Sequence, residues 1–135
     1  MSDGLLAIRN LQKLQSEWTT LSRKILKSYD ITYPQFRVLN GMHELQASGK
    51  RMTQSMVSEH TGIDVMTLST IIRNLENRRL IRRQESRSDT RAKNVYLTTI
   101  GLSFIEEMEP IIEQAADSFF EEFSSDLKNQ FCQLY

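Results

Sequence analysis

Residues 64–97 read DVMTLSTIIRNLENRRLIRRQESRSDTRAKNVYL, and this stretch decides the fold. Asp64 follows a glycine-containing turn, and its carboxylate is suited to the N-cap of a helix. Apolar side chains recur at helical spacing and predict a helix over 65–77 with one buried face, formed by Leu68, Ile71, Ile72 and Leu75. The opposite face carries mostly short polar side chains and one cation, namely Met66, Thr67, Ser69, Thr70, Arg73, Asn74 and Asn77.

Two short strands are predicted after this helix, over 81–85 and 93–97. The segment between them, 86–91, is polar and basic, which is typical of a projecting hairpin loop. Residues 54–61 predict another helix before the one over 65–77, and Gly62 allows a tight turn between these two helices. The sequence therefore predicts a helix-turn-helix followed by a two-stranded wing. The second helix, 65–77, is the recognition helix of such a motif and is called the reader helix.

The outward side chains of the reader helix are candidates for DNA contacts. Polar groups and arginine on a helix in the major groove reach base edges and phosphates, and apolar side chains near its start suit a thymine methyl group. The helix candidates are Val65, Met66, Thr67, Ser69, Thr70 and Arg73.

The wing supplies a second group of candidates. Arg91 suits a narrow, A·T-rich minor groove, where negative potential is concentrated. Asp89, two residues earlier, would orient that guanidinium by a bidentate pair. Further candidates, for phosphates, are Arg87, Ser88 and Lys93. The alternative for Asp89 and Arg91 is a pair that stabilises the turn and has no role in DNA binding.

The motifs around the wing resemble those of the MarR-type winged-helix transcription regulators. They are Leu75-Glu76, Leu80-Ile81, Asp89-x-Arg91, Leu97-Thr98 and Gly101, and the resemblance extends over the flanking helices to essentially the whole chain. In similar proteins the matching Asp and Arg play the wing roles given above. Two positions depart from the family pattern, since Arg79 stands where members often have Gly, and Ala92 where they often have a second Arg.

The composition fits one domain, residues 1–135, with a modest core. The single cysteine, Cys132, cannot form an intrachain disulfide, which fits a reducing compartment. The apolar runs are too short to span a bilayer, and the first residues lack the pattern of a signal peptide. These features predict a cytoplasmic protein.

The net charge is zero, but the charges are segregated along the chain. Residues 73–93 hold eight Arg or Lys and three acidic residues, whereas residues 101–135 hold eight acidic residues and one Lys. Attraction to phosphates is local, because charges more than about 8–10 Å apart are screened at physiological salt. The basic segment supports a DNA-binding region over 32–97, and the alternative is a solvated basic face.

The flanking segments 5–28 and 99–135 predict helical dimerisation arms. The first is a long helix with an apolar seam that steps by three and four residues. The second is a helix from 102 to 123 with two apolar stripes and a kink at Pro110, followed by a helix over 126–135. Two stripes indicate contacts on two sides and favour a homodimer, and the alternative is a monomeric core.

The region before the reader contains a capping box formed by Thr32 and Gln35, which predicts a helix that ends near Gly49. Residues 50–52 predict a short edge strand that closes the wing sheet. The family resemblance implies a small-molecule effector, such as an aromatic acid. The candidates to line its site are Trp18, Tyr29, Tyr33 and His43, and the alternative is that these side chains belong to the core.

No catalytic constellation or metal-ligand spacing is visible, so the sequence predicts no enzyme, no cofactor and no metal site. Cys132 has only Lys128 as a neighbouring cation and is interpreted as an inert thiol, not a redox sensor. The fold class expected is mainly α with a small β wing. The function expected is a homodimeric DNA-binding transcription regulator that acts as a repressor on a pseudo-palindromic operator. The alternative is a winged-helix module that binds another regulator.

Overall fold

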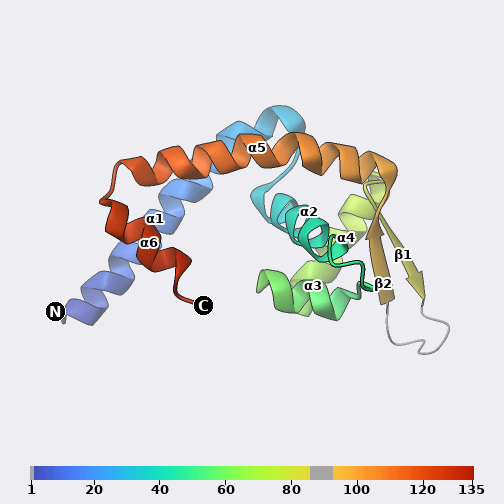
Figure 1. Cartoon of the computed structure of the whole chain (residues 1–135), viewed down its shortest axis with the longest axis horizontal. Coiled ribbons are helices and arrows are strands. Elements are labelled where there is room, and N and C mark those ends of the chain that lie inside the picture. Colours follow the sequence, from blue (N-terminus) through green and yellow to red (C-terminus); the bar gives the residue numbers. More distant parts are fainter. Residues whose placement is uncertain (1, 86–92) are drawn as a thin grey trace. The chain divides into compact units, whose positions relative to one another are not determined.

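The computed structural model describes residues 2–85 and 93–135 (Figure 1). The elements in chain order are α1 (Asp3–Leu26), the 3₁₀ turn η1 (Lys27–Tyr29), α2 (Tyr33–Gln46), α3 (Gln54–Thr61), α4 (Val65–Asn77), β1 (Ile81–Glu85), β2 (Lys93–Leu97), α5 (Thr99–Glu121) and α6 (Ser125–Cys132). The predicted fold class, mainly helical with a small β wing, is confirmed. Within the described residues, no helix is both long and apolar enough to cross a bilayer.

The chain divides into two compact units. The wing unit comprises Ile31–Glu109, and the arm unit comprises Met1–Asp30 with Pro110–Tyr135. The boundary lies inside α5, between Glu109 and Pro110. The helix continues through Pro110, and the predicted kink there remains a prediction.

In the wing unit, α2 packs against α3 and α4, while β1 lies beside α4 and β2 beside α2 (Figure 1). The predicted capping box starts α2, because Thr32 accepts from the Gln35 N–H at 3.2 Å and Gln35 accepts from the Thr32 N–H at 3.0 Å. The fully buried side chains of this core are Val38, Leu39, Met42, Val57, Leu68, Ile72, Leu75, Ile81, Ile105 and Met108. Each such residue contributes about 1.5–3 kcal/mol through burial, so this core fixes how α4 presents its other face.

The sheet is an antiparallel pair in which Ile81 lies opposite Leu97 and Glu85 opposite Lys93. The prediction of a third strand over 50–52 is wrong, since only an isolated bridge joins Thr53 to Asn94. The reason is that Thr53 already caps α3, where its hydroxyl accepts from the Met56 N–H, so the chain turns into a helix after one pairing.

The hairpin base is joined tightly to the start of α5. The Leu80 carbonyl accepts from the Thr98 N–H at 3.1 Å, and a Cβ on Gly101 would lie 1.9 Å from the same carbonyl oxygen. Thr98 caps α5 as predicted, since its hydroxyl accepts from the Gly101 N–H at 3.0 Å. Only glycine therefore fits at position 101.

In the arm unit, Ser2 caps the N-terminus of α1, because its hydroxyl accepts from the Leu5 N–H at 3.1 Å. Trp18 on α1 lies against Phe119 on α5, with ring centroids 5.5 Å apart, and Phe119 contacts further rings of the same unit. The final helix is shorter than the predicted range 126–135, since α6 ends at Cys132. The arm unit is thus held by aromatic contacts between α1, α5 and α6.

Candidate nucleic-acid interface

The turn between α3 and α4 is fixed by backbone geometry and side-chain hydrogen bonds. Gly62 adopts φ 75°, which L side chains rarely take, and its N–H donates to the Ser58 carbonyl at 2.9 Å. The Ser58 hydroxyl donates to the Ile63 carbonyl at 2.6 Å, and the Arg37 guanidinium donates to the Thr61 carbonyl. These contacts hold α4 at one angle to α3.

Asp64 caps α4 as predicted. Its Oδ1 accepts from the Thr67 N–H at 2.9 Å, and its Oδ2 accepts from the Thr67 hydroxyl at 2.8 Å. These hydrogen bonds, the backbone one first, hold the pKa of the Asp64 carboxyl below its usual value. Because Thr67 has donated its only hydroxyl proton, it can act toward a base only as an acceptor.

The outward face of α4 is the one that the sequence pattern predicts. Val65 is 58% exposed and Met66 is 84% exposed, and Thr67, Thr70 and Arg73 are also exposed. Ser69 is half-buried, while Leu68, Ile71, Ile72 and Leu75 are buried. Among the described residues, Arg73 forms no ion pair, so its charge is open to an anionic partner.

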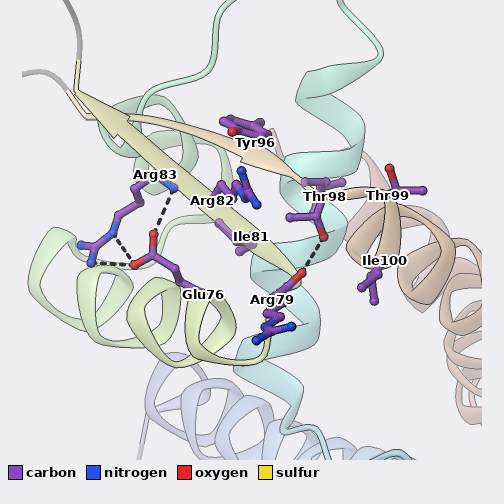
Figure 2. A pocket seen from close by; sticks show the side chains of 10 residues that line it. Glu76, Arg79, Ile81, Arg82, Arg83, Tyr96, Thr98, Thr99 and Ile100 are labelled. Atoms are coloured by element: carbon purple, nitrogen blue, oxygen red, sulfur yellow. Dashed lines mark hydrogen bonds and ion pairs between the residues drawn. The ribbon is translucent and has the colours of Figure 1, made fainter.

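The Glu76 carboxylate on α4 holds the first wing strand, a role that no local sequence pattern indicates. Glu76 Oε1 accepts from Arg83 Nε at 3.1 Å and from Nη2 at 2.9 Å, and its Oε2 accepts from the Arg83 backbone N–H at 3.1 Å (Figure 2). The pair is partly buried, and charge-assisted bonds of this kind are among the stronger ones. Glu76 and Arg83 therefore set the position of β1 relative to the reader helix.

The turn between α4 and β1 passes through Arg79 in the left-handed region, at φ 63°. This is the position where MarR-type regulators often have glycine, and the structure shows why glycine suits it. The Arg79 carbonyl accepts from the Thr98 hydroxyl at 2.6 Å, so the strained turn is tied to the start of α5 (Figure 2).

The comparisons with known proteins agree with this architecture. Residues 20–108 match the family described as transcriptional regulator SarA/Rot. The chain belongs to the SarA/Rot family of transcriptional regulators. A related sequence is the HTH-type transcriptional regulator YdcH of Bacillus subtilis (strain 168), which is 28% identical over 110 residues, 82% of this chain and 75% of YdcH.

Solved structures place this SarA/Rot-family chain beside MarR-type regulators. The S. aureus MepR–DNA complex is similar with a TM-score of 0.81 and 27% identity, over 91% of this chain and 88% of MepR. AbsC of Streptomyces coelicolor, a MarR family transcriptional regulator, is similar with a TM-score of 0.82 and 23% identity, over 97% of this chain and 88% of AbsC. The likeness to AbsC concerns the fold alone. The resemblance to MarR-type winged-helix regulators is confirmed.

The wing candidates of this SarA/Rot-family protein lie largely outside the described residues. This applies to Arg87, Ser88, Asp89 and Arg91, and Lys93 is described only as the first residue of β2. Their predicted contacts with DNA remain predictions.

The candidates for an effector site are distributed over both units. Trp18 and Tyr29 belong to the arm unit, and Tyr33 and His43 belong to the wing unit. In the wing unit, Tyr33 stacks on Phe36, and His43 Nδ1 lies 2.7 Å from Glu109 Oε1. Their role in binding an effector remains a prediction.

The Glu109 carboxylate also accepts from Asn40 Nδ2 at 2.7 Å, so two side chains of α2 hold the last residue of the wing unit. Sequence reasoning missed this cluster, because its members are far apart in the chain. Within the described part of the chain, no group of three or more His, Cys, Asp or Glu side chains could hold a metal.

Proposed function

We propose that this SarA/Rot-family regulator binds double-stranded DNA as a homodimer, with α4 in the major groove and the wing, 86–92, at the flanking minor groove. The observation that carries the proposal is the outward face of α4. It combines two exposed apolar side chains at its start, exposed threonines and one unpaired arginine among the described residues. This face is held in place by the Asp64 cap and by the buried side chains behind it.

Each side chain of the face has a defined role in the proposal. Val65 and Met66 contact thymine methyl groups, and Thr70 reaches base edges or phosphates. Arg73 pairs with a guanine or a phosphate. Thr67 accepts a hydrogen bond from a base amine, because its own proton is donated to Asp64. Ser69, which is half-buried, lies at the edge of the contact.

For the wing we propose that Arg91 enters the minor groove and that Asp89 orients it. Arg87, Ser88 and Lys93 then contact phosphates on either side. The support is the local sequence pattern and the family resemblance, together with the strand register that pairs Glu85 with Lys93, the residues on either side of 86–92.

The homodimer is supported by apolar side chains that the single chain leaves exposed on α1. Leu5, Leu6, Ile8 and Leu11 are each between 43% and 55% exposed. Such a row on a helix indicates a surface that another molecule covers. A two-fold symmetric dimer would place two reader helices about 34 Å apart, about one turn of the duplex, so the operator would be a pseudo-palindrome.

We further propose that the protein acts as a cytoplasmic repressor and that an aromatic acid relieves its binding. A ligand of this kind changes the affinity only if it binds one conformation better than the other. Tyr33 and His43 are the candidates in the wing unit, and Trp18 and Tyr29 those in the arm unit.

Selection of bound duplexes from a random DNA pool tests the proposal. We expect a two-fold symmetric consensus whose half-sites are centred about 10 base pairs apart. The Arg73→Ala variant, selected in parallel, is expected to keep the symmetry and to lose preference at one position of each half-site. A wild-type protein that sediments as a single subunit and ignores duplexes at low salt would overturn both the dimer and the DNA assignment.

A further inference from the structure

A groove with a volume of about 890 Å³ lies at the base of the wing hairpin (Figure 2). It is formed by the turn after α4, the paired ends of β1 and β2, and the first residues of α5. The side chains that matter for its chemistry are Arg79, Arg82, Tyr96 and Ile100.

The groove is cationic. Arg79 and Arg82 are exposed, and neither forms an ion pair with any described residue. Among the described residues, the acidic residue that lines the groove is Glu76, and both of its oxygens already accept hydrogen bonds from Arg83. Two guanidinium groups are therefore open to an anionic partner, since no carboxylate in the described part of the lining neutralises them.

The groove also exposes large apolar side chains. Tyr96 is 39% exposed and Ile100 is 60% exposed, whereas most other large apolar residues of the wing unit are buried. Arg82 lies opposite Tyr96 in the antiparallel register, so the two side chains share one face of the ribbon. Arginine and tyrosine beside an exposed aliphatic side chain are typical of protein–protein interfaces.

The groove is distant from the start of α4 and from the far end of the hairpin, where most of the proposed DNA-binding residues lie. Ile81 and Leu97 pair at the base of the hairpin, four residues from its far end at Glu85, a distance of about 13 Å along the strand. Glu76 lies eleven residues beyond Val65, which is about 16 Å along α4. The groove is therefore about 16 Å along α4 from Val65 and about 13 Å along the strand from Glu85. Arg73, the DNA candidate nearest to Glu76 on α4, is three residues or about 4.5 Å away along the helix axis.

We propose that this groove binds an acidic segment of a protein partner. Carboxylates of the segment pair with Arg82 and Arg79, and an apolar side chain of the segment packs against Tyr96 and Ile100. A phosphate backbone would use the two arginines but would leave the apolar side chains uncovered, so the mixed chemistry favours a peptide. This inference does not depend on the proposed DNA binding.

Hydrogen bonds hold the backbone of the groove in place. The Arg79 carbonyl is held by the Thr98 hydroxyl, and the backbone of Arg83 is held by Glu76 (Figure 2). Binding therefore orders side chains such as those of Arg79 and Arg82 and leaves this backbone as it is, so the entropic cost is limited to side-chain rotamers.

Panning a display library of short random peptides on the intact protein tests the inference. We expect enriched peptides that combine Asp or Glu with a large apolar residue. Arg82→Ser and Ile100→Ser are each expected to weaken these peptides about tenfold, as measured by fluorescence anisotropy. Arg73→Ser, which removes an exposed arginine outside the groove, is the matched control and is expected to leave peptide binding unchanged.

Charge reversal sharpens the test. The Arg82→Glu variant is expected to lose the enrichment of acidic peptides, because the new carboxylate offsets the remaining open cation at Arg79. The proposal is overturned if the enriched peptides lack acidic residues or if they bind Arg82→Ser as well as wild type. It is also overturned if Arg82→Ser weakens duplex binding as much as Arg73→Ser does, because the groove would then contact phosphates. Failure of wild type to bind duplexes, with peptide binding intact, would remove only the proposed function.

Discussion

Replacing Arg79 by glycine is expected to stabilise the protein. Arg79 adopts φ 63°, and the left-handed region costs an L-residue about 1–2 kcal/mol relative to its normal conformations. Glycine avoids this cost but loses more backbone entropy on folding, by about 0.5–1 kcal/mol. With the middle of each range, the net gain relative to alanine at the same position is about 0.75 kcal/mol.

The comparison of Arg79→Gly with Arg79→Ala isolates the backbone effect, because both variants remove the same guanidinium and only one removes the Cβ. For a chain of 135 residues, the expected difference in melting temperature is about 2–4 °C in favour of glycine. Thermal unfolding followed by circular dichroism measures this difference. The hydrogen bond from Thr98 to the carbonyl of residue 79 is retained in both variants.

A second control tests whether the effect belongs to this position. Arg82 is also exposed but lies within β1, where glycine weakens a strand, so Arg82→Gly is expected to melt below Arg82→Ala. The reasoning is refuted if Arg79→Gly melts at or below Arg79→Ala. Both Arg79 variants are expected to bind acidic peptides more weakly than wild type, because each loses a cation of the groove.

Further substitutions test the contacts that position the wing and the reader helix. Gly101→Ala is expected to lower stability by about 3 kcal/mol or more, since the added Cβ would overlap the carbonyl of the hairpin base, and an unchanged urea midpoint would contradict that contact. Glu76→Gln and Arg83→Gln are expected to show a coupling energy of about 1 kcal/mol in a double-mutant cycle, and simple additivity would argue against the pair. Arg91→Ala is expected to weaken operator binding by about 1–3 kcal/mol without lowering the melting temperature, and equal affinity in a gel-shift titration would exclude it as a contact. Asp64 has a lowered pKa in the folded state, so its capping contribution is complete above about pH 4 and is lost as the pH falls through the folded pKa. The gap in melting temperature between wild type and Asp64→Ala is therefore expected to narrow below pH 4, and a constant gap would contradict this.

Local sequence patterns predicted most of the elements. The prediction of α4 and its buried face came from four apolar residues at helical spacing. On a helix this spacing places them on one side, and that side is the one that is buried, namely Leu68, Ile71, Ile72 and Leu75. Asp64 and Thr98 were identified as caps because a cap accepts from a backbone N–H only three residues later, which a local sequence pattern can predict.

Contacts between distant elements could not be predicted in this way. Nothing in the local pattern pairs Glu76 with Arg83 across a turn or brings Asn40 and His43 to Glu109 more than 60 residues later. The sequence also did not predict how far the chain before Thr53 would pair with β2. Thr53 can either continue a strand or cap α3, and in the structure it caps α3 after a single bridge to Asn94. For the left-handed backbone at Arg79, one signal was present in the sequence. It is the family pattern, in which glycine often stands where this chain has arginine at the α4–β1 turn.

The short junction between the hairpin base and α5 connects the fold to both proposed surfaces. The Leu80 carbonyl, the Thr98 hydroxyl and the missing side chain of Gly101 together fix where β1 begins, where β2 ends and where α5 starts. A change at this junction would displace the wing and the groove together, so loss of function in such a variant would not distinguish the two surfaces. Exposed side chains can distinguish them, because Arg73 and Arg82 make no ion pair in the described part of the chain and can be replaced without disturbing the junction. A regulator that uses both surfaces should lose DNA binding with the first substitution and peptide binding with the second, and each variant should keep the other activity.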